Sequence, residues 1–153
     1  MADAHQFCTF YLDGHYFGLD VLQVQEIIRY QEMTRVPLAP AVVRGLINLR
    51  GQIVTAIDLR RRLDLSDRPA DQLPLNVVVR TDDGAVSLLV DEIGDVLEVP
   101  DELFERPPET LKGTARELIR GAYKLPDRLL LILDAERTVD VTGSGLSTNG
   151  ARC

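Results

Sequence analysis

A tight-turn signal occurs twice in this chain, and this repetition constrains the fold more than any other feature of the sequence. Asp13-Gly14 stands between two segments rich in strand-forming residues, 7–12 and 16–21, and Asp83-Gly84 stands between the similar segments 75–81 and 85–90. Asp-Gly readily takes the positive φ angles that a two-residue hairpin turn requires. We therefore expect two antiparallel β-hairpins, one in each half of the chain.

The similarity between the halves extends beyond the hairpins. Apolar residues after the first hairpin match residues after the second at an offset of 69 positions, namely Leu19, Val21, Val24, Ile27 and Ile28 with Leu88, Val90, Ile93, Val96 and Leu97. Further along, at an offset of 76, Gly45, Leu49, Ile53, Ile57 and Asp58 match Gly121, Leu125, Leu129, Leu133 and Asp134. Both later stretches follow a strand–turn–strand pattern, with turns at Arg50-Gly51 and Pro126-Asp127. A repeat with its turns in register predicts two similar β-units in one chain.

The two units are separated by a polar connection. Residues 64–74 carry Pro69 and Pro74, which do not suit a central strand, so we expect the seam there. This gives halves of about 6–66 and 75–140, with strands open to exchange at the seam, and a small polar tail, 141–153, that we expect to be disordered. Helix is confined to short pieces: 20–28 has helix-like apolar spacing, 39–44 is a turn, and 134–139 is a terminal helix.

Short strands with regularly spaced turns fit two small β-barrels or one sandwich. We favour barrels, because closing a sheet removes the exposed strand edges that promote aggregation.

Composition excludes several classes of function. The chain has 24 acidic against 17 basic residues, a net charge of −7, whereas nucleic-acid binding needs a positive footprint. No apolar run reaches the roughly 18 residues of a membrane helix, and the N-terminus lacks a signal-peptide pattern. Cys8 and Cys153 lie near opposite ends and do not suggest a disulfide framework. We expect a cytoplasmic protein.

The sequence offers no catalytic constellation. His5 and His15 are the histidines, and we expect His5 in a frayed terminus and His15 facing solvent after its turn. Cys8 with these histidines makes a poor zinc site, and the carboxylates around Asp91 and Asp101 lack a calcium-loop pattern, so we interpret them as solvated faces. The Arg60–Arg62 run is flanked by acidic residues and predicts a locally neutralised surface. We expect no catalytic residue, metal or cofactor.

Glu26 and Arg50 stand out because each interrupts an apolar segment. They are either an ordinary surface ion pair, typically worth under about 1 kcal/mol, or the polar rim of an apolar groove that receives a partner.

Four segments together resemble the CheW family of chemotaxis adaptors: FGLDVLQVQEIIR (17–29), VPLAP (36–40), VRGLINLRGQIVTAIDLRRRLDL (43–65) and LLVDEIGDVLEV (88–99). The resemblance covers about residues 6–140. One departure is Thr55, where the family commonly has proline, which concerns strand geometry and not binding. The resemblance implies a mainly β fold of two five-stranded SH3-like β-barrels packed side by side with a few short helices. It also implies no enzymatic activity.

The resemblance also implies partners and site residues. A groove between the barrels would receive the cytoplasmic tip of a chemoreceptor, and the regulatory domain of a CheA-type histidine kinase would bind end to end through apolar strands whose residues no motif identifies. The protein would then work within receptor arrays at the inner face of the membrane. The implied receptor-binding residues are Val24, Glu26, Gly45, Arg50, Ile93 and Val96, and the family motif is Asn48, Leu49, Arg50 and Gly51. Ile93 and Val96 fit an ordinary core equally well.

Two alternatives stay open at this stage. The same adaptor chemistry could serve another chemosensory output, such as pilus-driven motility. A small-molecule-binding or enzymatic β-barrel would instead show a deep cavity with convergent polar groups, in place of a shallow apolar groove.

Overall fold

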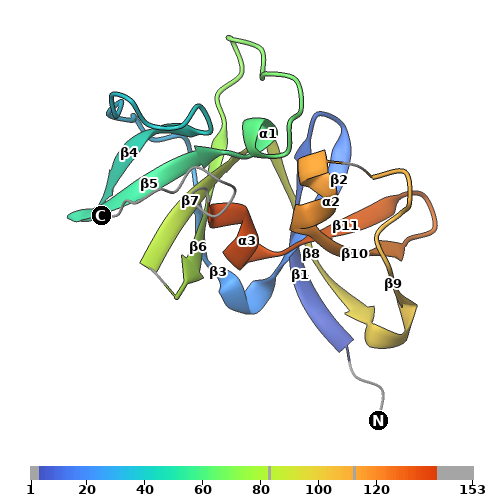
Figure 1. Ribbon diagram of the computed structural model, residues 1–153. Helices are drawn as coiled ribbons and strands as arrows, with labels where there is room; N and C mark the ends of the chain where they lie inside the picture. The colour runs from blue at the N-terminus through green and yellow to red at the C-terminus, as the bar shows by residue number, and fades with distance from the viewer. Residues whose placement is uncertain (1–3, 83, 112, 141–153) are drawn as a thin grey trace.

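The computed structural model describes residues 4–82, 84–111 and 113–140, and shows a mainly β protein with two sheets (Figure 1). The six-stranded sheet has the order β8 (Glu92–Pro100), β1 (Ala4–Leu12), β2 (His15–Asp20), β11 (Leu129–Leu133), β10 (Ile119–Lys124) and β9 (Phe104–Glu105). The five-stranded sheet has the order β3 (Val24–Ile28), β6 (Leu75–Thr81), β7 (Gly84–Val90), β5 (Gln52–Asp58) and β4 (Val43–Leu49). The predicted fold class is confirmed, with the two-residue strand β9 as an addition that the sequence did not predict.

The strand orders repeat the internal duplication. If β1, β2, β3, β4 and β5 are matched with β6, β7, β8, β10 and β11, the order β8-β1-β2-β11-β10 becomes β3-β6-β7-β5-β4, which is the order of the other sheet. The corresponding pairs β2–β11 and β5–β7 are both parallel. Each sheet therefore combines the first hairpin of one repeat with later strands of the other, and each repeat contributes to both sheets. The domain limits 6–140 and the boundaries of the halves at 66 and 75 stay predictions.

Two of the predicted turns form as expected. Asp13 (φ 49°) and Gly14 (φ 81°) connect β1 to β2, and Arg50 (φ 53°) and Gly51 (φ 90°) connect β4 to β5. The second Asp-Gly turn differs from the prediction: Gly84 pairs with Thr81 as the first residue of β7, so Gly84 belongs to the strand and not to the turn. Asp83, Cys153 and the predicted disordered tail, 141–153, lie outside the described residues.

The short helices follow the predictions in part. The helical prediction for 20–28 is wrong beyond its first turn: 3-10 helix η1 covers only Val21–Gln23, and β3 follows because Val24–Ile28 pairs with β6. The turn within 39–44 forms at 41–42, where the Val43 amide donates to the Pro40 carbonyl (2.9 Å), but Val43 and Arg44 belong to β4. The terminal helix is confirmed as α3 (Ala135–Val139). Helices α1 (Leu59–Arg62), α2 (Gly113–Leu118) and η2 (Asp101–Leu103) were not predicted.

Buried apolar side chains form three clusters. One, here called the junction cluster, draws on both sheets and includes Phe10, Leu19, Val77, Leu88 and Leu133. The second belongs to the six-stranded sheet, around Phe7, Tyr123 and Leu130, and the third to the five-stranded sheet, around Ile47, Val54 and Leu89. Helix α3 follows β11 of one sheet and contacts β6 of the other. The sheets are thus held together by shared apolar burial, the main favourable term in folding.

Candidate functional site

The β4–β5 hairpin carries the Asn48-Leu49-Arg50-Gly51 motif, and each residue has a separate structural role. Leu49 is buried in the five-stranded sheet's cluster, and the Asn48 Oδ1 accepts a hydrogen bond from the Gly51 amide (2.8 Å). Arg50 and Gly51 both have positive φ, as a two-residue turn of this kind requires. The turn therefore projects the Arg50 side chain, which is 68% exposed, from the end of the β4–β5 hairpin.

Arg50 contacts Glu26 of β3, so the structure brings together the two charged residues that the sequence singled out. The Arg50 Nη2 donates to the Glu26 carboxylate in an exposed ion pair. The hydrogen bond from Arg50 lowers the pKa of the Glu26 carboxyl below its ordinary value, and the same bond raises the pKa of the Arg50 guanidinium. Both groups are therefore charged at neutral pH.

Gly45 lies beneath the segment 33–34. A Cβ built on Gly45 would stand 2.6 Å from the Thr34 carbonyl oxygen, and Thr34 forms an isolated bridge with Leu46. Glycine at this position lets the segment cross close to β4. Gly45 is buried, so it shapes the site from below and does not present a side chain to a partner.

The apolar residues predicted for the site divide by burial. Val24 of β3 and Ile93 of β8 both pack against the junction cluster, at the boundary between the sheets. Val96 of β8 is 56% exposed, and further exposed apolar side chains are Leu22, Ile27 and Ile53. Exposed apolar side chains with charged neighbours are typical of a docking surface.

Sequence reasoning missed a buried ionic cluster, made of Asp58, Arg60, Arg68 and Asp91. Arg60 donates to Asp91 through Nε (3.0 Å) and Nη2 (2.5 Å), and the Arg68 Nε donates to the same carboxylate (2.9 Å). Asp58 accepts from the Arg60 amide as the N-cap of α1 (3.1 Å). The predictions of a solvated face at Asp91 and of a surface position for Arg60 are therefore wrong, because the two side chains neutralise each other in the interior.

Burial alone would raise the pKa of the Asp91 carboxyl. The hydrogen bonds from Arg60, the Asp13 amide and Arg68 outweigh this effect and hold the pKa below its usual value. No local sequence signal marks this burial, because Asp91 directly follows the segment that forms β7 and is adjacent to the exposed Glu92.

The histidines and Cys8 form no reactive group in the part of the chain that the structure describes. His15 is exposed as predicted, whereas His5 is not frayed: it pairs with Val99 within β1 and contacts Asp101. Cys8 is a buried free thiol whose pKa is raised by burial and by Asp20. Residues 4–82, 84–111 and 113–140 contain no group of three potential metal ligands, and no helix among them is long and apolar enough to cross a membrane.

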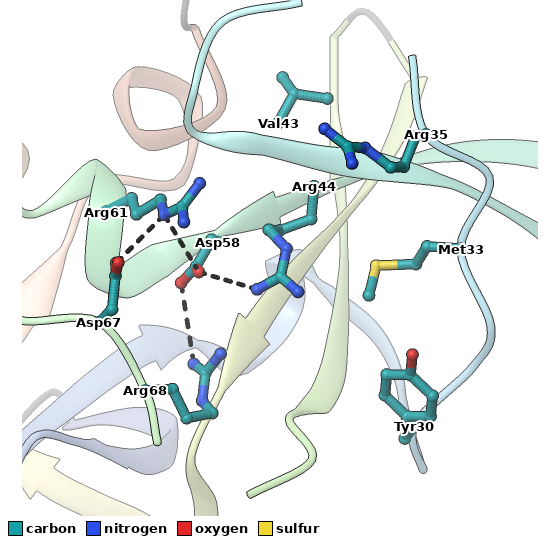
Figure 2. A pocket seen from close by; sticks show the side chains of 9 residues that line it. All are labelled: Tyr30, Met33, Arg35, Val43, Arg44, Asp58, Arg61, Asp67 and Arg68. Carbon is teal, nitrogen blue, oxygen red and sulfur yellow. Dashed lines mark hydrogen bonds and ion pairs between the residues drawn. The ribbon is translucent and has the colours of Figure 1, made fainter. Parts of the chain in front are cut away.

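A polar cavity of about 480 Å³ lies beside β4 and α1 (Figure 2). Four arginines and two aspartates line it, including Arg44, Asp58 and Arg68. None of the receptor-binding residues predicted from the sequence lines this cavity.

A doubled β fold with an exposed ion pair and exposed apolar side chains is typical of a protein-docking module. Comparison with known proteins agrees: the CheW-like domain family matches residues 6–142. The chemotaxis protein CheW of Klebsiella aerogenes is 32% identical over 147 residues, which is 96% of this chain and 89% of that protein. The scaffolding protein TtCheW of Thermoanaerobacter tengcongensis superposes with a TM-score of 0.82 at 26% identity, over 94% of this chain and 97% of the other.

The chain therefore belongs to the CheW family of chemotaxis scaffold proteins. A weaker similarity, 25% identity over 74% of this chain and 64% of the relative, links it to the protein PilI of Pseudomonas aeruginosa.

Proposed function

We propose that this protein couples chemoreceptors to a CheA-type histidine kinase by binding both at once, without catalysing a reaction. The observation that carries the proposal is the Glu26–Arg50 pair, which links β3 to the tip of the β4–β5 hairpin in a chain of the CheW family. A partner that binds on this rim would meet two charged groups already fixed in position, at a small loss of side-chain entropy.

The receptor-binding surface in this proposal consists of Val24, Glu26, Arg50, Ile93 and Val96, with Gly45 as a positioning residue. Val24 and Ile93 sit at the boundary between the sheets, where they support the proposal of a groove there. Exposed Val96 would contribute apolar contact on the β8 side. A helical receptor tip suits such a groove, because an amphipathic helix buries one apolar face and leaves charges at its margin.

The kinase's regulatory domain is the second partner in this proposal. Two simultaneous interfaces let each bound partner raise the local concentration of the other, so a modest affinity at each interface suffices. Receptor conformation then controls the kinase by changing which arrangement is populated. An array of such contacts would form at the inner face of the membrane.

The test is direct binding of the purified chain to a CheA-type kinase from the same cell, measured by calorimetry. We expect saturable binding to the intact kinase and none to a kinase that lacks its regulatory domain. Failure to bind the intact kinase would contradict the proposal.

The similarity to PilI supports a second candidate function, in which the protein has the same adaptor role in pilus-driven motility. The binding chemistry would be unchanged, and deletion of the gene would abolish twitching motility and not swimming.

A further inference from the structure

Positive charge is concentrated at one place on a protein that is acidic as a whole. The polar cavity beside β4 and α1 is lined by Arg35, Arg44, Arg61 and Arg68, against the two carboxylates of Asp58 and Asp67. Its lining therefore carries an excess of two positive charges, although the chain carries a net charge of −7. This contrast calls for an explanation other than surface solvation.

The arginines are only partly neutralised by their neighbours. Arg44 uses Nη1 for Asp58 (3.3 Å), and 40% of its side chain is exposed. Arg61 is held by Asp67 (3.1 Å) and by the Ala41 carbonyl (3.0 Å). Arg35 has no hydrogen bond or ion pair with the residues that the structure describes. The cavity therefore keeps N–H donors for a ligand.

Arg68 gives an independent indication of a missing acceptor. Its side chain is only 4% exposed, its Nε donates to Asp91 (2.9 Å), and its Nη2 lies 3.8 Å from Asp58. Its Nη1 is buried and has no hydrogen-bond partner. Leaving a buried charged donor unsatisfied is costly, and such groups in native proteins call for an explanation. Figure 2 shows the Asp58 carboxylate between the guanidinium groups of Arg44 and Arg68, with an interaction to each.

We propose that this cavity binds a phosphate dianion, either as free phosphate or as the phosphoryl group of a small phosphate monoester. Arginine is the preferred phosphate ligand, since its planar N–H fork matches two phosphate oxygens. At neutral pH a phosphate monoester carries a charge close to −2, which matches the charge excess of the lining. A cavity of about 480 Å³ is larger than a phosphate needs, and Tyr30 and Met33 supply a less polar wall for an organic remainder.

The ligand would enter past the exposed Arg35 and Arg44, which would make first contact. The Arg68 Nη1 is buried, so the side chains over it would shift to admit the phosphate. The long-range field of the acidic protein opposes anion entry, so the binding energy comes from these short-range donors and weakens with added salt.

The experiment is an NMR titration of the uniformly ¹⁵N-labelled full chain with inorganic phosphate, adenosine monophosphate and succinate in separate arms. We expect saturable shifts of the amides of residues 33–35, 43–44, 61 and 68 with phosphate or the monophosphate. A lower Kd for adenosine monophosphate than for inorganic phosphate identifies a monoester as the ligand, and equal Kd values identify free phosphate. The R35Q/R44Q double variant should bind at least about tenfold more weakly, the effect of losing one charge-assisted hydrogen bond.

Two controls keep the outcome decisive. R106Q removes the same charge at an exposed arginine that does not line the cavity, and it should bind like the wild type. If R44Q reduces stability because it removes the contact with Asp58, the single variant R35Q tests the site without disturbing Asp58. The proposal is overturned if neither phosphate nor the monophosphate binds at a ligand concentration of about 10 mM, which is ten times the Kd of about 1 mM of a weak site. It is also overturned if succinate binds as well as phosphate, or if R106Q weakens binding as much as R35Q.

Discussion

Arg50 holds a backbone conformation, φ 53°, that residues with side chains seldom adopt, and it does so in the exposed two-residue turn between β4 and β5. Asparagine or glycine would fit this turn position with less strain. In this conformation the turn places the Arg50 guanidinium against the Glu26 carboxylate. At the residue scale, the site is therefore a fixed charge pair more than an apolar patch.

The coupling between Glu26 and Arg50 can be measured through receptor binding. We expect E26Q and R50Q each to weaken binding of the chain to a receptor cytoplasmic fragment, and the double variant to lose less than the two effects combined. The reason is that either single change also disrupts the positioned partner. Additive losses would mean that the two residues act separately.

Asp91 is a buried carboxylate that pairs with two buried arginines. We expect D91N to destabilise the protein by about 3–5 kcal/mol, because the buried Arg60 and Arg68 would lose the carboxylate closest to them and keep only Asp13 and Asp58 at 3.8 Å. Denaturant unfolding at pH 7 measures this, with D95N, at an exposed position on β8, as the matched control.

The pH dependence of the unfolding free energy is a second test of the contribution of Asp91. Because the folded pKa of Asp91 is lowered, its contribution is complete above the unfolded value of about 3.9 and is lost as pH falls through the folded pKa. D91N should flatten this part of the wild-type stability profile. A D91N profile that falls as steeply as the wild type would show that other groups carry the acid sensitivity.

At the scale of elements, the repeat in the sequence predicts more than composition could. Helix α1 begins after Asp58 and α3 after Asp134, the two aspartates that match at an offset of 76, and each accepts a hydrogen bond as an N-cap. The sequence predicted only α3, although the same alignment marks α1. The helix prediction for the β3 segment was wrong for another reason. Its apolar spacing fits a helix, but pairing with β6 decides its conformation.

Burial of charge is what the sequence could not reveal. The residue pair Arg60 and Asp91 is separated by 31 positions, and neither has a local feature that distinguishes it from the exposed Arg61 or Glu92. For the site, Glu26 and Arg50 could be predicted because each interrupts an apolar segment. The burial of Gly45 could not, since it depends on where the segment 33–34 crosses β4.

That crossing can be tested with G45A. The added methyl group would meet the Thr34 carbonyl oxygen at 2.6 Å, so the 33–34 segment must move, and we expect a loss of about 1–3 kcal/mol in unfolding free energy. G18A is the control, because its methyl would meet only side-chain atoms at 3.2 Å or more. Unchanged stability of G45A combined with lost receptor binding would instead place Gly45 in contact with the partner.

At the scale of the whole molecule, each repeat contributes strands to both sheets, and the junction cluster draws on both. Neither sheet is therefore complete without both repeats. This arrangement fixes the relative position of the two sheets, which a scaffold needs if it is to hold two partners in a defined geometry.

We accordingly expect the sheets to unfold as one cooperative unit. Native-state hydrogen exchange should give the same opening free energy for Leu19 in β2 and Leu88 in β7, both fully buried. Distinct values, with one sheet opening well before the other, would show that the exchange of strands does not couple them.

Receptor-dependent activation of the kinase tests the central claim most directly. In a reconstitution of receptor fragment and CheA-type kinase, we expect the wild-type chain to raise the autophosphorylation rate. The charge-reversed R50E should give little or no rise while unfolding at the same denaturant concentration as the wild type. R106E is the matched control and should activate fully. If R50E activates the kinase as well as the wild type does, the Glu26–Arg50 rim is not the receptor site and the account is wrong.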